Sequence, residues 1–596
     1  MSRFSLRPRT LASGSLRNAC ARGATLALAA VLAAAAACRG GGSDAPPPAD
    51  APDGGDAATG GPRWLGVEGE RLAPPPPHQQ AKTAHFTTHD ACAQCHLSKD
   101  TATLRDPKGR DISPVGRWKP TMMALAARDP YYVAAFADEL EARPGLRSTV
   151  ERTCARCHAP EASVEIDLES GRAPSFALMT AEVSPNAHIA REGVACTGCH
   201  QITSEGLGTF PSFTGGFSIG TSRLVYGPHD APLTDPMRLI VDFTPFKSVH
   251  VLESSLCATC HTVVTRAPLA GGKQGPEFPE QVPYLEWRAS AFRAEAPVGA
   301  KATTCQQCHM PSVDEDGQEI RSPLATTPPD LKARSPHARH AFLGPNAYML
   351  GVAAANDAWG ATATPEELGA QAALQRAFLR SSAELRVNAS REGDAGVVRV
   401  KITNATGHKL PTGYPSRRMW VHVKVARADG AALFESGRSD AFGRLVDRTG
   451  ALVEPATFFP HFDVIDDDAK VQVYEAVPVN ADGKVVHRPL DAITFGKDNR
   501  LLPQGFDKRH EWAAYTTPKG VDDDPSWGSE DEITYRVARA EPGARVEVRL
   551  VFQTIRPSDF EALAQKPTPA ARRLFDMVSR TPPTPEVIAE ATATIP

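Results

Sequence analysis

The sequence of 596 residues predicts a multidomain protein, in which a mainly α-helical and irregular segment is followed by an all-β, Ig-like sandwich and a short helical tail. Three observations support this fold class. Ten of the 12 cysteines lie in five short motifs between residues 85 and 345. Apolar and polar residues alternate from residue 383 onward, which is typical of strands. The 41% hydrophobic and 22% charged residues are typical of folded chains.

Residues 1–38 have the pattern of an export signal. Five arginines and no acidic residue precede the 14-residue apolar run from Ala24 to Ala37, which is shorter than the about 20 residues of a membrane-spanning helix. Cys38 follows three alanines and resembles the lipid-attachment cysteine of bacterial lipoproteins. Plain secretion, with Cys38 as an unmodified thiol, is the alternative. We expect an exported protein, either periplasmic or associated with the outer membrane through a lipid anchor.

Residues 39–84 are rich in Gly, Asp, Ala and Pro and predict a disordered linker. The formal net charge is −4, and it becomes −9 when the five arginines of residues 1–37 are removed with the signal. A nucleic-acid partner is therefore disfavoured, because phosphates attract a basic surface.

The ten remaining cysteines repeat one pattern, Cys-x-x-Cys-His. It recurs as Cys92, Cys95, His96; Cys154, Cys157, His158; Cys196, Cys199, His200; Cys257, Cys260, His261; and Cys305, Cys308, His309. This is the attachment spacing of c-type haem, in which two thiols add to the haem vinyl groups and the histidine binds the iron. Zinc ligands or redox disulfides are the alternatives, but a histidine would follow all five pairs by chance with a probability of roughly 10⁻⁸. We therefore predict five covalent haems in residues 85–345.

A longer repeat surrounds two of these motifs. His85 and His250 each precede the first cysteine of a motif by seven residues, and Trp118-x-x-Thr and Trp287-x-x-Ser follow. This order predicts a duplicated haem-binding unit. With the motif array it resembles the multihaem cytochromes c that include the tetrahaem electron acceptor of hydroxylamine oxidoreductase and the octahaem tetrathionate reductases. In that family a histidine often ends the tryptophan element, whereas this chain has Met123 and Phe292 there.

The resemblance implies that further side chains bind the irons from the distal side. The candidates are His85, His188, His250, His340 and Met123, and His89, His229 and His337 are runners-up. Met123 is as consistent with packing beside a haem as with iron binding. The arginines Arg117, Arg191 and Arg288 are candidate partners for haem propionates.

The second half contains no attachment motif. Thr364-Pro-Glu-Glu predicts the capped start of a helix in the connecting segment, residues 346–382, which leads to the sandwich at residues 383–556. Alternating runs such as Val398 to Ile402 and Met419 to Val425 predict its strands, and residues 557–596 predict a helical tail with a weak final helix. The loop TGHKLPTGYPSRR lies between two strands. We favour a turn-rich connection, and the alternative is a loop docked on the haem segment, with His408 as a ligand or Arg417 and Arg418 on haem propionates.

Two functions remain open at this point. The first is an electron carrier that exchanges electrons with other redox proteins of the cell envelope, with no catalytic residue. The second is an enzyme in which one haem lacks a protein ligand and binds a small nitrogen or sulfur compound. The sequence does not determine the oligomeric state.

Overall fold

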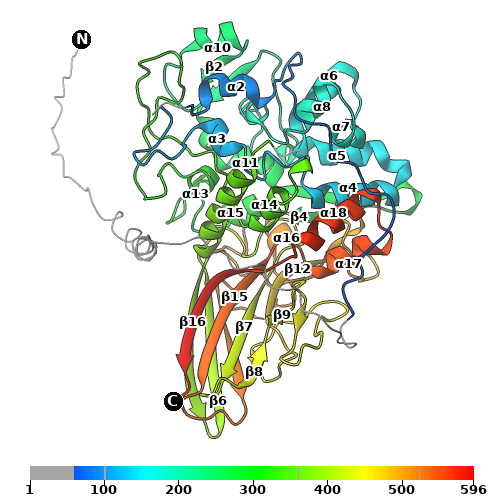
Figure 1. Cartoon of the computed structure of the whole chain (residues 1–596), viewed down its shortest axis with the longest axis vertical. Coiled ribbons are helices and arrows are strands. Elements are labelled where there is room, and N and C mark those ends of the chain that lie inside the picture. The colour runs from blue at the N-terminus through cyan, green and yellow to red at the C-terminus, as the bar shows by residue number, and fades with distance from the viewer. Residues whose placement is uncertain (1–59, 100–102, 360–361, 523) are drawn as a thin grey trace, which may run out of the picture.

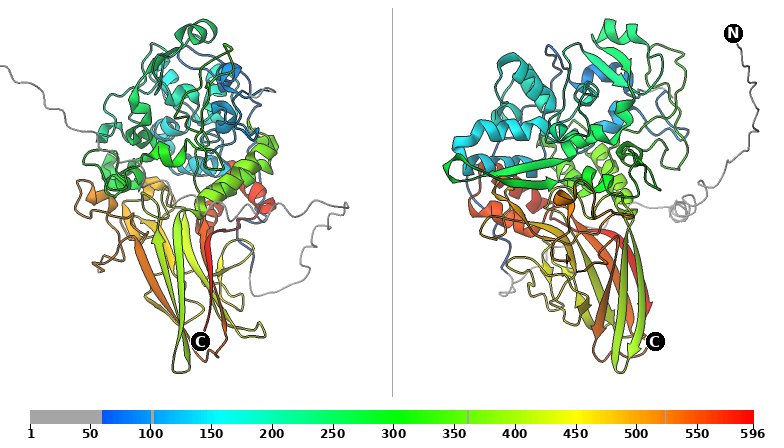
Figure 2. Two further views of the ribbon diagram at one scale, coloured as in Figure 1. Left: turned by 90° about the vertical axis from the view of Figure 1, so that its left-hand side faces the viewer. Right: turned by 180° about the vertical axis from the view of Figure 1, so that it is seen from behind.

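The computed structural model describes residues 60–99, 103–359, 362–522 and 524–596. Helices and long loops form one end of the molecule, and long strands form the other, with the C-terminus at the far tip of the strands (Figure 1). The side views show the same two parts meeting along one broad junction (Figure 2). The export signal, Cys38 and residues 39–59 of the predicted linker lie outside the described residues.

Short helices dominate the part that carries the cysteine motifs. They are α2 (His89–His96), α3 (Pro114–Trp118), α4 (Pro130–Ala142), α5 (Arg147–His158), α6 (Pro160–Ser170), α7 (Phe176–Thr180), α8 (Pro185–Ala190), α9 (Cys196–Cys199), α10 (Thr234–Ile240), α11 (Ser254–His261), α12 (Pro283–Arg288) and α13 (Cys305–His309). Two small sheets accompany them: β1 (Leu224–Gly227) pairs with β2 (Thr244–Lys247), and β3 (Val263–Pro268) pairs with β4 (Gln274–Gln281). The mainly helical and irregular character agrees with the prediction.

Two helices lead from this part to the strands, α14 (Ala347–Ala354) and α15 (Pro365–Arg380). Thr364 caps α15 as the sequence predicts, because its hydroxyl accepts the N–H of Glu367 and the Glu367 carboxylate accepts the N–H of Thr364. The predicted apolar face of α15, which includes Leu368, Ala372 and Leu379, is buried.

The strands form two large sheets that share one hydrophobic core. One sheet has the order β11 (Val464–Ile465), β14 (Glu530–Val537), β6 (Ala395–Asn404), β5 (Ala383–Glu392). The other has the order β13 (Thr494–Asp498), β12 (Val473–Val479), β7 (Arg418–Ala426), β15 (Arg545–Gln553), β16 (Glu586–Thr594), and β8 (Ala432–Ser436) also pairs with β7. Val400 and Tyr535 of the first sheet pack with Val423 and Leu550 of the second. A layered all-β part is thus present, while its immunoglobulin-like character stays a prediction.

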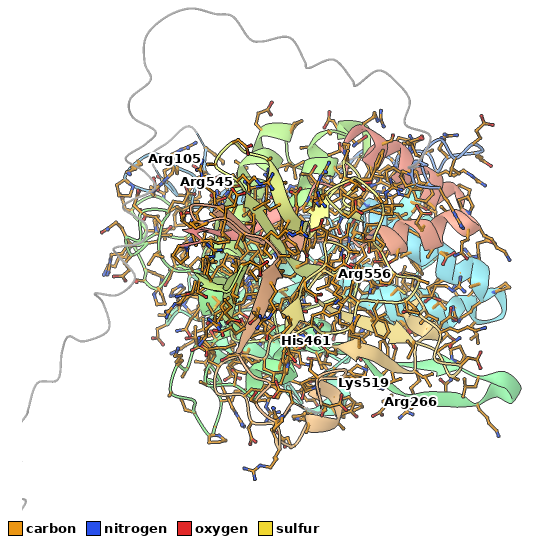
Figure 3. All side chains as sticks on the ribbon, turned by 90° about the horizontal axis from the view of Figure 1, so that it is seen from below. Arg105, Arg266, His461, Lys519, Arg545 and Arg556 are labelled. Carbon is orange, nitrogen blue, oxygen red and sulfur yellow. The ribbon has the colours of Figure 1, made fainter. Side chains whose placement is uncertain are left out.

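Shorter elements complete this part: β9 (Arg438–Ser439) pairs with β10 (Leu445–Val446), and α16 (Ala513–Thr516) lies in the long connection before β14. Figure 3 looks along the molecule from the strand end, and Arg556 lies towards the middle of this view while Arg266 lies at its edge. The side chain of Arg556 is buried, and that of Arg266 is half exposed.

The predicted tail is helical only in its first half. α17 (Pro557–Gln565) and α18 (Pro569–Arg580) form, but the final helix is wrong, because residues 586–594 are strand β16. This segment pairs along β15 from Glu586 opposite Phe552 to Thr594 opposite Arg545. Ile588 and Ile595 enter the shared core. The free edge of β15 satisfies the backbone of this weakly patterned segment better than an isolated helix would.

The described part of the predicted linker, residues 60–84, is also not a free tether. Trp64 is 1% exposed and packs against the aromatic rings of Phe560 and Phe575. The guanidinium of Arg71 donates two hydrogen bonds to Asp576 on α18. We call residues 62–72 the N-terminal strap. One buried indole and one bidentate ion pair hold it, although its composition is that of a disordered chain.

No helix among the described residues is both long and apolar enough to cross a membrane.

Candidate functional site

Each Cys-x-x-Cys-His motif lies at the C-terminal end of a helix. The motifs lie at the C-terminal ends of α2, α5, α9, α11 and α13, with His200 as the residue that follows α9. Cysteines three residues apart lie on the same face of one helical turn, and the next residue, the histidine, leads out of it. The ten cysteines of the motifs form no disulfide; nine are partly exposed and Cys308 is exposed. All five motifs therefore have the local geometry that thioether attachment of a haem requires.

Four of the five motif histidines are oriented through the Nδ1 atom. Nδ1 donates to a backbone carbonyl at 2.5–2.8 Å in His96, His158, His200 and His309, with Leu324, Ala126, Tyr226 and Leu343 as the acceptors. Such a bond fixes the tautomer and leaves Nε2 as the atom that can bind a metal. Burial lowers the pKa of His158 and of His309 to about 4, which keeps both rings neutral and able to coordinate.

The attachment motifs also touch one another. The thiol of Cys196 lies close enough to Cys92 to interact with it, as does that of Cys257 with Cys305 and that of Cys157 with Cys260, and each interaction raises the pKa of the first thiol. Burial, with smaller effects of Glu161 and Cys260, raises the pKa of Cys199 to about 12. These thiol pairs bring together the first and third motifs, the second and fourth, and the fourth and fifth, and the third lies near the fourth, since Cys260 influences the pKa of Cys199.

The tryptophan elements occupy equivalent places in the two predicted repeats. The indole N–H of Trp118 donates to the carbonyl of Val194, and that of Trp287 donates to the carbonyl of Thr303. Each acceptor lies two residues before the first cysteine of an attachment motif. The tryptophans thus join the first motif to the third and the fourth to the fifth, which agrees with the duplication predicted from the sequence.

The third motif begins with a tightly fitted helix start. Oε1 of Glu161 accepts the backbone N–H groups of Ala195 and Gly198 at 2.8 and 3.0 Å. A Cβ atom at Gly198 would lie 2.6 Å from that oxygen. The glycine in the motif Cys-Thr-Gly-Cys-His is therefore explained by the carboxylate packed against it.

Among the predicted distal residues, His340 has the most informative position. Its ring faces that of His200, with centroids 6.2 Å apart and an interplanar angle of 23°. Nδ1 of His340 is engaged by the carbonyl of Ala338, and burial lowers its pKa to about 3. A coordinating imidazole nitrogen lies about 2 Å from its metal. Since the ring centroid is about 1 Å further away, two imidazoles on opposite sides of one metal have centroids about 6 Å apart.

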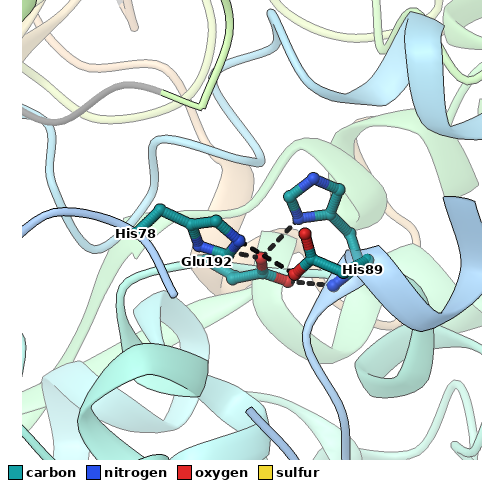
Figure 4. Close-up of side chains that lie close together, drawn as sticks. His78, His89 and Glu192 are labelled. Atoms are coloured by element: carbon teal, nitrogen blue, oxygen red, sulfur yellow. Dashed lines mark hydrogen bonds and ion pairs between the residues drawn. The ribbon is translucent and has the colours of Figure 1, made fainter. Parts of the chain in front are cut away.

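His85 and the runner-up His89 share a second arrangement, a carboxylate clamp. The carboxylate of Glu165 accepts two hydrogen bonds from His85, one from the backbone N–H at 3.0 Å and one from Nδ1 at 3.1 Å. Glu192 does the same for His89, at 2.6 and 2.5 Å (Figure 4). In both residues Nε2 has no hydrogen-bond partner among the described residues. Such clamps orient metal-binding imidazoles and increase their basicity.

The clamp at His89 belongs to a larger group. His78 and Asp90 join His89 and Glu192, and one donor atom of each lies within 4.8 Å of the others. His78 contacts Asp90 at 2.8 Å and Glu192 at 3.6 Å. The group has donor types that bind metals, but both nitrogens of His78 and Nδ1 of His89 are already engaged by carboxylates. We therefore interpret it as the support that orients His89.

The remaining predicted ligands are arranged differently. Nδ1 of His188 accepts a hydrogen bond from Arg191. Nε2 of His250 donates a hydrogen bond to the carbonyl of Ile202, and Nε2 of the runner-up His337 donates one to the carbonyl of Ile112. In these tautomers Nε2 carries the proton. Met123 is half-buried, with its carbonyl bonded to the N–H of Val194. Burial and the charge of Arg334 lower the pKa of His229.

Buried arginines fit the charge of haem propionates. Nε and Nη2 of Arg117 and Nε of Arg339 are buried without a hydrogen-bond partner among the described residues. The two arginines are near each other, since burial and the charge of Arg117 lower the pKa of Arg339. α3, which carries Arg117, packs on α2 with the first motif. Arg191 and Arg288, by contrast, already have protein partners, two backbone carbonyls and two carboxylates respectively.

Sequence reasoning missed Glu165 and Glu192. Each lies about 80 to 100 residues from the histidine that it clamps, and no local pattern connects them. It also missed Tyr132, whose ring lies parallel to that of His158 at 3.6 Å.

No family model matches the chain, and no curated protein is similar to it. One solved structure is similar over 86% of this chain and 100% of its own, a penta-heme cytochrome c552 from Thermochromatium tepidum, with 16% identity and a TM-score of 0.47.

Proposed function

We propose that the protein is a multihaem c-type cytochrome that carries electrons through five covalently bound haems. The observation that carries this proposal is the proximity of the five attachment motifs, each of which lies near at least one other. Haems bound at neighbouring motifs lie next to one another, so that an electron can pass along the set without a substrate at any iron. When bound, the haems supply reversible one-electron redox chemistry, and the protein tunes it through ligands, burial and hydrogen bonds.

The chain supplies the iron ligands in two sets. We assign the proximal positions to His96, His158, His200, His261 and His309. His340 is the distal residue for the third haem, and the clamped His85 and His89 are the best-supported distal candidates for others. Arg117 and Arg339 are the candidate propionate partners.

We further propose that the protein works outside the cytoplasm, held by a lipid at Cys38, with other envelope redox proteins as partners. The basic and apolar pattern of residues 1–38 supports this, and c-type haem attachment in bacteria takes place on that side of the membrane. Replacing Cys38 by Ser should release the protein from the membrane fraction. If the variant stays with the membrane, another anchor is responsible.

The haem proposal is tested by the purified protein itself. We expect five haems per chain from the pyridine haemochrome assay and the corresponding increase in protein mass. The variant Cys154→Ala/Cys157→Ala should lose one haem and keep four. A haem content that does not change in this variant would contradict attachment at the second motif.

An enzyme with one open haem is the second candidate, and the second motif favours it. Among the described residues no second imidazole faces His158 in the way that His340 faces His200, and the hydroxyl of Tyr132, which packs on the face of the His158 ring, is buried without a partner there. Burial raises the pKa of Glu280 to about 8, and Cys154 and this carboxyl are close enough to influence each other. A protonated Glu280 could supply a proton to a bound oxyanion.

Carbon monoxide separates the two functions. For an electron carrier we expect all five reduced haems to stay low-spin and to give no change in absorbance on addition of CO. A shift that corresponds to one haem would favour the enzyme. Loss of that shift on removal of the second haem would locate the open iron there.

A further inference from the structure

The segment between β6 and β7, residues 405–417, leaves the strands and enters the part with the attachment motifs. His408 lies at its start, and its ring faces that of His309 with centroids 6.3 Å apart and an interplanar angle of 15°. The arrangement of His200 and His340 is nearly the same, at 6.2 Å and 23°. Both spacings are those of two imidazoles on opposite sides of one metal, about 6 Å.

The nitrogen atoms of the two rings are also suitably arranged. Nδ1 of His309 is bonded to the carbonyl of Leu343, and Nδ1 of His408 is bonded to the carbonyl of Lys409 at 3.0 Å. Nε2 of His408 has no hydrogen-bond partner among the described residues, and burial lowers the pKa of the ring. Each imidazole is thus held neutral with Nε2 as its coordinating atom.

The segment is anchored to the helical part on both sides of His408. Oε2 of Glu286, on α12, accepts the backbone N–H of Lys409 at 3.0 Å and the hydroxyl of Thr412 at 2.7 Å. Gly407 packs so closely that a Cβ atom there would lie 3.2 Å from both Trp287 and Phe292. Trp287 in turn donates to Thr303, next to the fifth motif.

The strands hold the same segment from their side. The amide of Asn404 donates to the carbonyl of His408 and to those of Leu501 and Leu502. The ammonium of Lys409 is fully buried in an ion pair with Asp498, at 2.6 Å. Lys409 is thus held by Glu286 of the helical part and by Asp498 of the strands, and the backbone of the neighbouring His408 has little freedom.

We propose that His408, a residue of the β part, is the second axial ligand of the haem attached at Cys305 and Cys308, opposite His309. This inference rests on the proposed function, because it requires a haem at the fifth motif. It gives the β part a direct role: the fifth haem is six-coordinate only when segment 405–417 is docked. The spin state of that haem then reports contact between the two parts of the molecule.

The test uses the full-length, haem-loaded protein and begins with the haem content of the wild type, which tests the proposed function separately. In His408→Ala we expect an unchanged haem content, the conversion of one low-spin ferric haem to high-spin by electron paramagnetic resonance, and CO binding by one haem. In His408→Gly, added imidazole should restore the low-spin signal. The matched control is His422→Ala, in strand β7 that follows the segment and bonded to Glu435, which should leave all haems low-spin.

The outcomes are distinguishable. If all haems of His408→Ala stay low-spin, or if His422→Ala gives the same high-spin signal, the assignment is overturned although the protein is still a multihaem cytochrome. If the alanine variant does not accumulate, His408→Met decides. A thioether at this position should raise one midpoint potential and leave the others unchanged, whereas an unaltered redox titration overturns the assignment.

Discussion

The hydrogen bond at Nδ1 determines what each histidine of this chain can bind. Where Nδ1 donates to a carbonyl or carboxylate, as in His85, Nε2 remains available for iron. Where Nε2 itself donates the hydrogen bond, as in His250, that nitrogen is occupied and does not bind iron. The sequence places both residues at the same distance before a motif, and only their partners distinguish them.

The clamp on His85 gives a prediction at this scale. In Glu165→Gln the negative acceptor at Nδ1 is lost, so the imidazole donates less charge to ferric iron. We expect one midpoint potential to rise, by roughly 60 mV for each tenfold change in relative affinity for ferric iron. Spectroelectrochemical titration measures the shift. Glu169→Gln, an exposed change on the same helix, should leave the potentials unchanged. A titration of Glu165→Gln identical to wild type would mean that His85 binds no iron.

At the scale of elements, the N-terminal strap joins two ends of the chain. Trp64 fills a space between Phe442, Phe560 and Phe575, so that the strap covers α17 and α18. α18 also packs along α4, which carries Tyr132 beside the second motif. The strap therefore supports the helix next to that motif.

Removal of the buried indole should loosen this element. We expect Trp64→Ala to lower the free energy of unfolding by about 3 to 5 kcal/mol, because the cavity is lined by large aromatic rings. Urea unfolding measures the loss, and limited proteolysis should cut within residues 62–72 sooner. The neighbouring Leu65 is 44% exposed, and Leu65→Ala should have little effect. Equal stability of both variants would contradict the anchoring role of Trp64.

At the scale of the whole molecule, buried charges join the helices to the strands. Arg500 connects Glu286 of α12 to Asp498 of β13. On another side, Arg556 contacts Asp559 of α17 at 3.3 Å and Glu475 of β12 at 3.8 Å. His487 adds a hydrogen bond to Asp559 at 2.7 Å. Because a buried charge without its partner is costly, these pairs fix how the two parts meet.

Asp559 makes this junction sensitive to acid. Burial alone would raise its pKa, but Arg556 and His487 outweigh burial and lower it from 3.8 to about 2. Since the folded pKa is below the unfolded one, the stabilisation is present above pH 4 and is lost as the pH falls towards 2.

We expect Asp559→Asn to destabilise the protein by about 2 kcal/mol at pH 7 and the deficit to disappear between pH 4 and pH 2. Urea unfolding midpoints at several pH values measure the deficit. Asp482→Asn, in an exposed turn, is the control. A deficit that does not depend on pH would mean that packing, not charge, makes Asp559 important.

The sequence by itself determined the five attachment motifs, the tryptophan repeat, the capped helix α15 and most strands. These features depend on contacts within one helical turn or on period-two alternation, which neighbouring residues fix. Only the tertiary structure decided which imidazoles face each other, that Glu165 and Glu192 clamp histidines, that residues 586–594 form a strand, and that His408 reaches the fifth motif. These features depend on which distant segments pack together, and the spacing of residues along the sequence does not determine that packing.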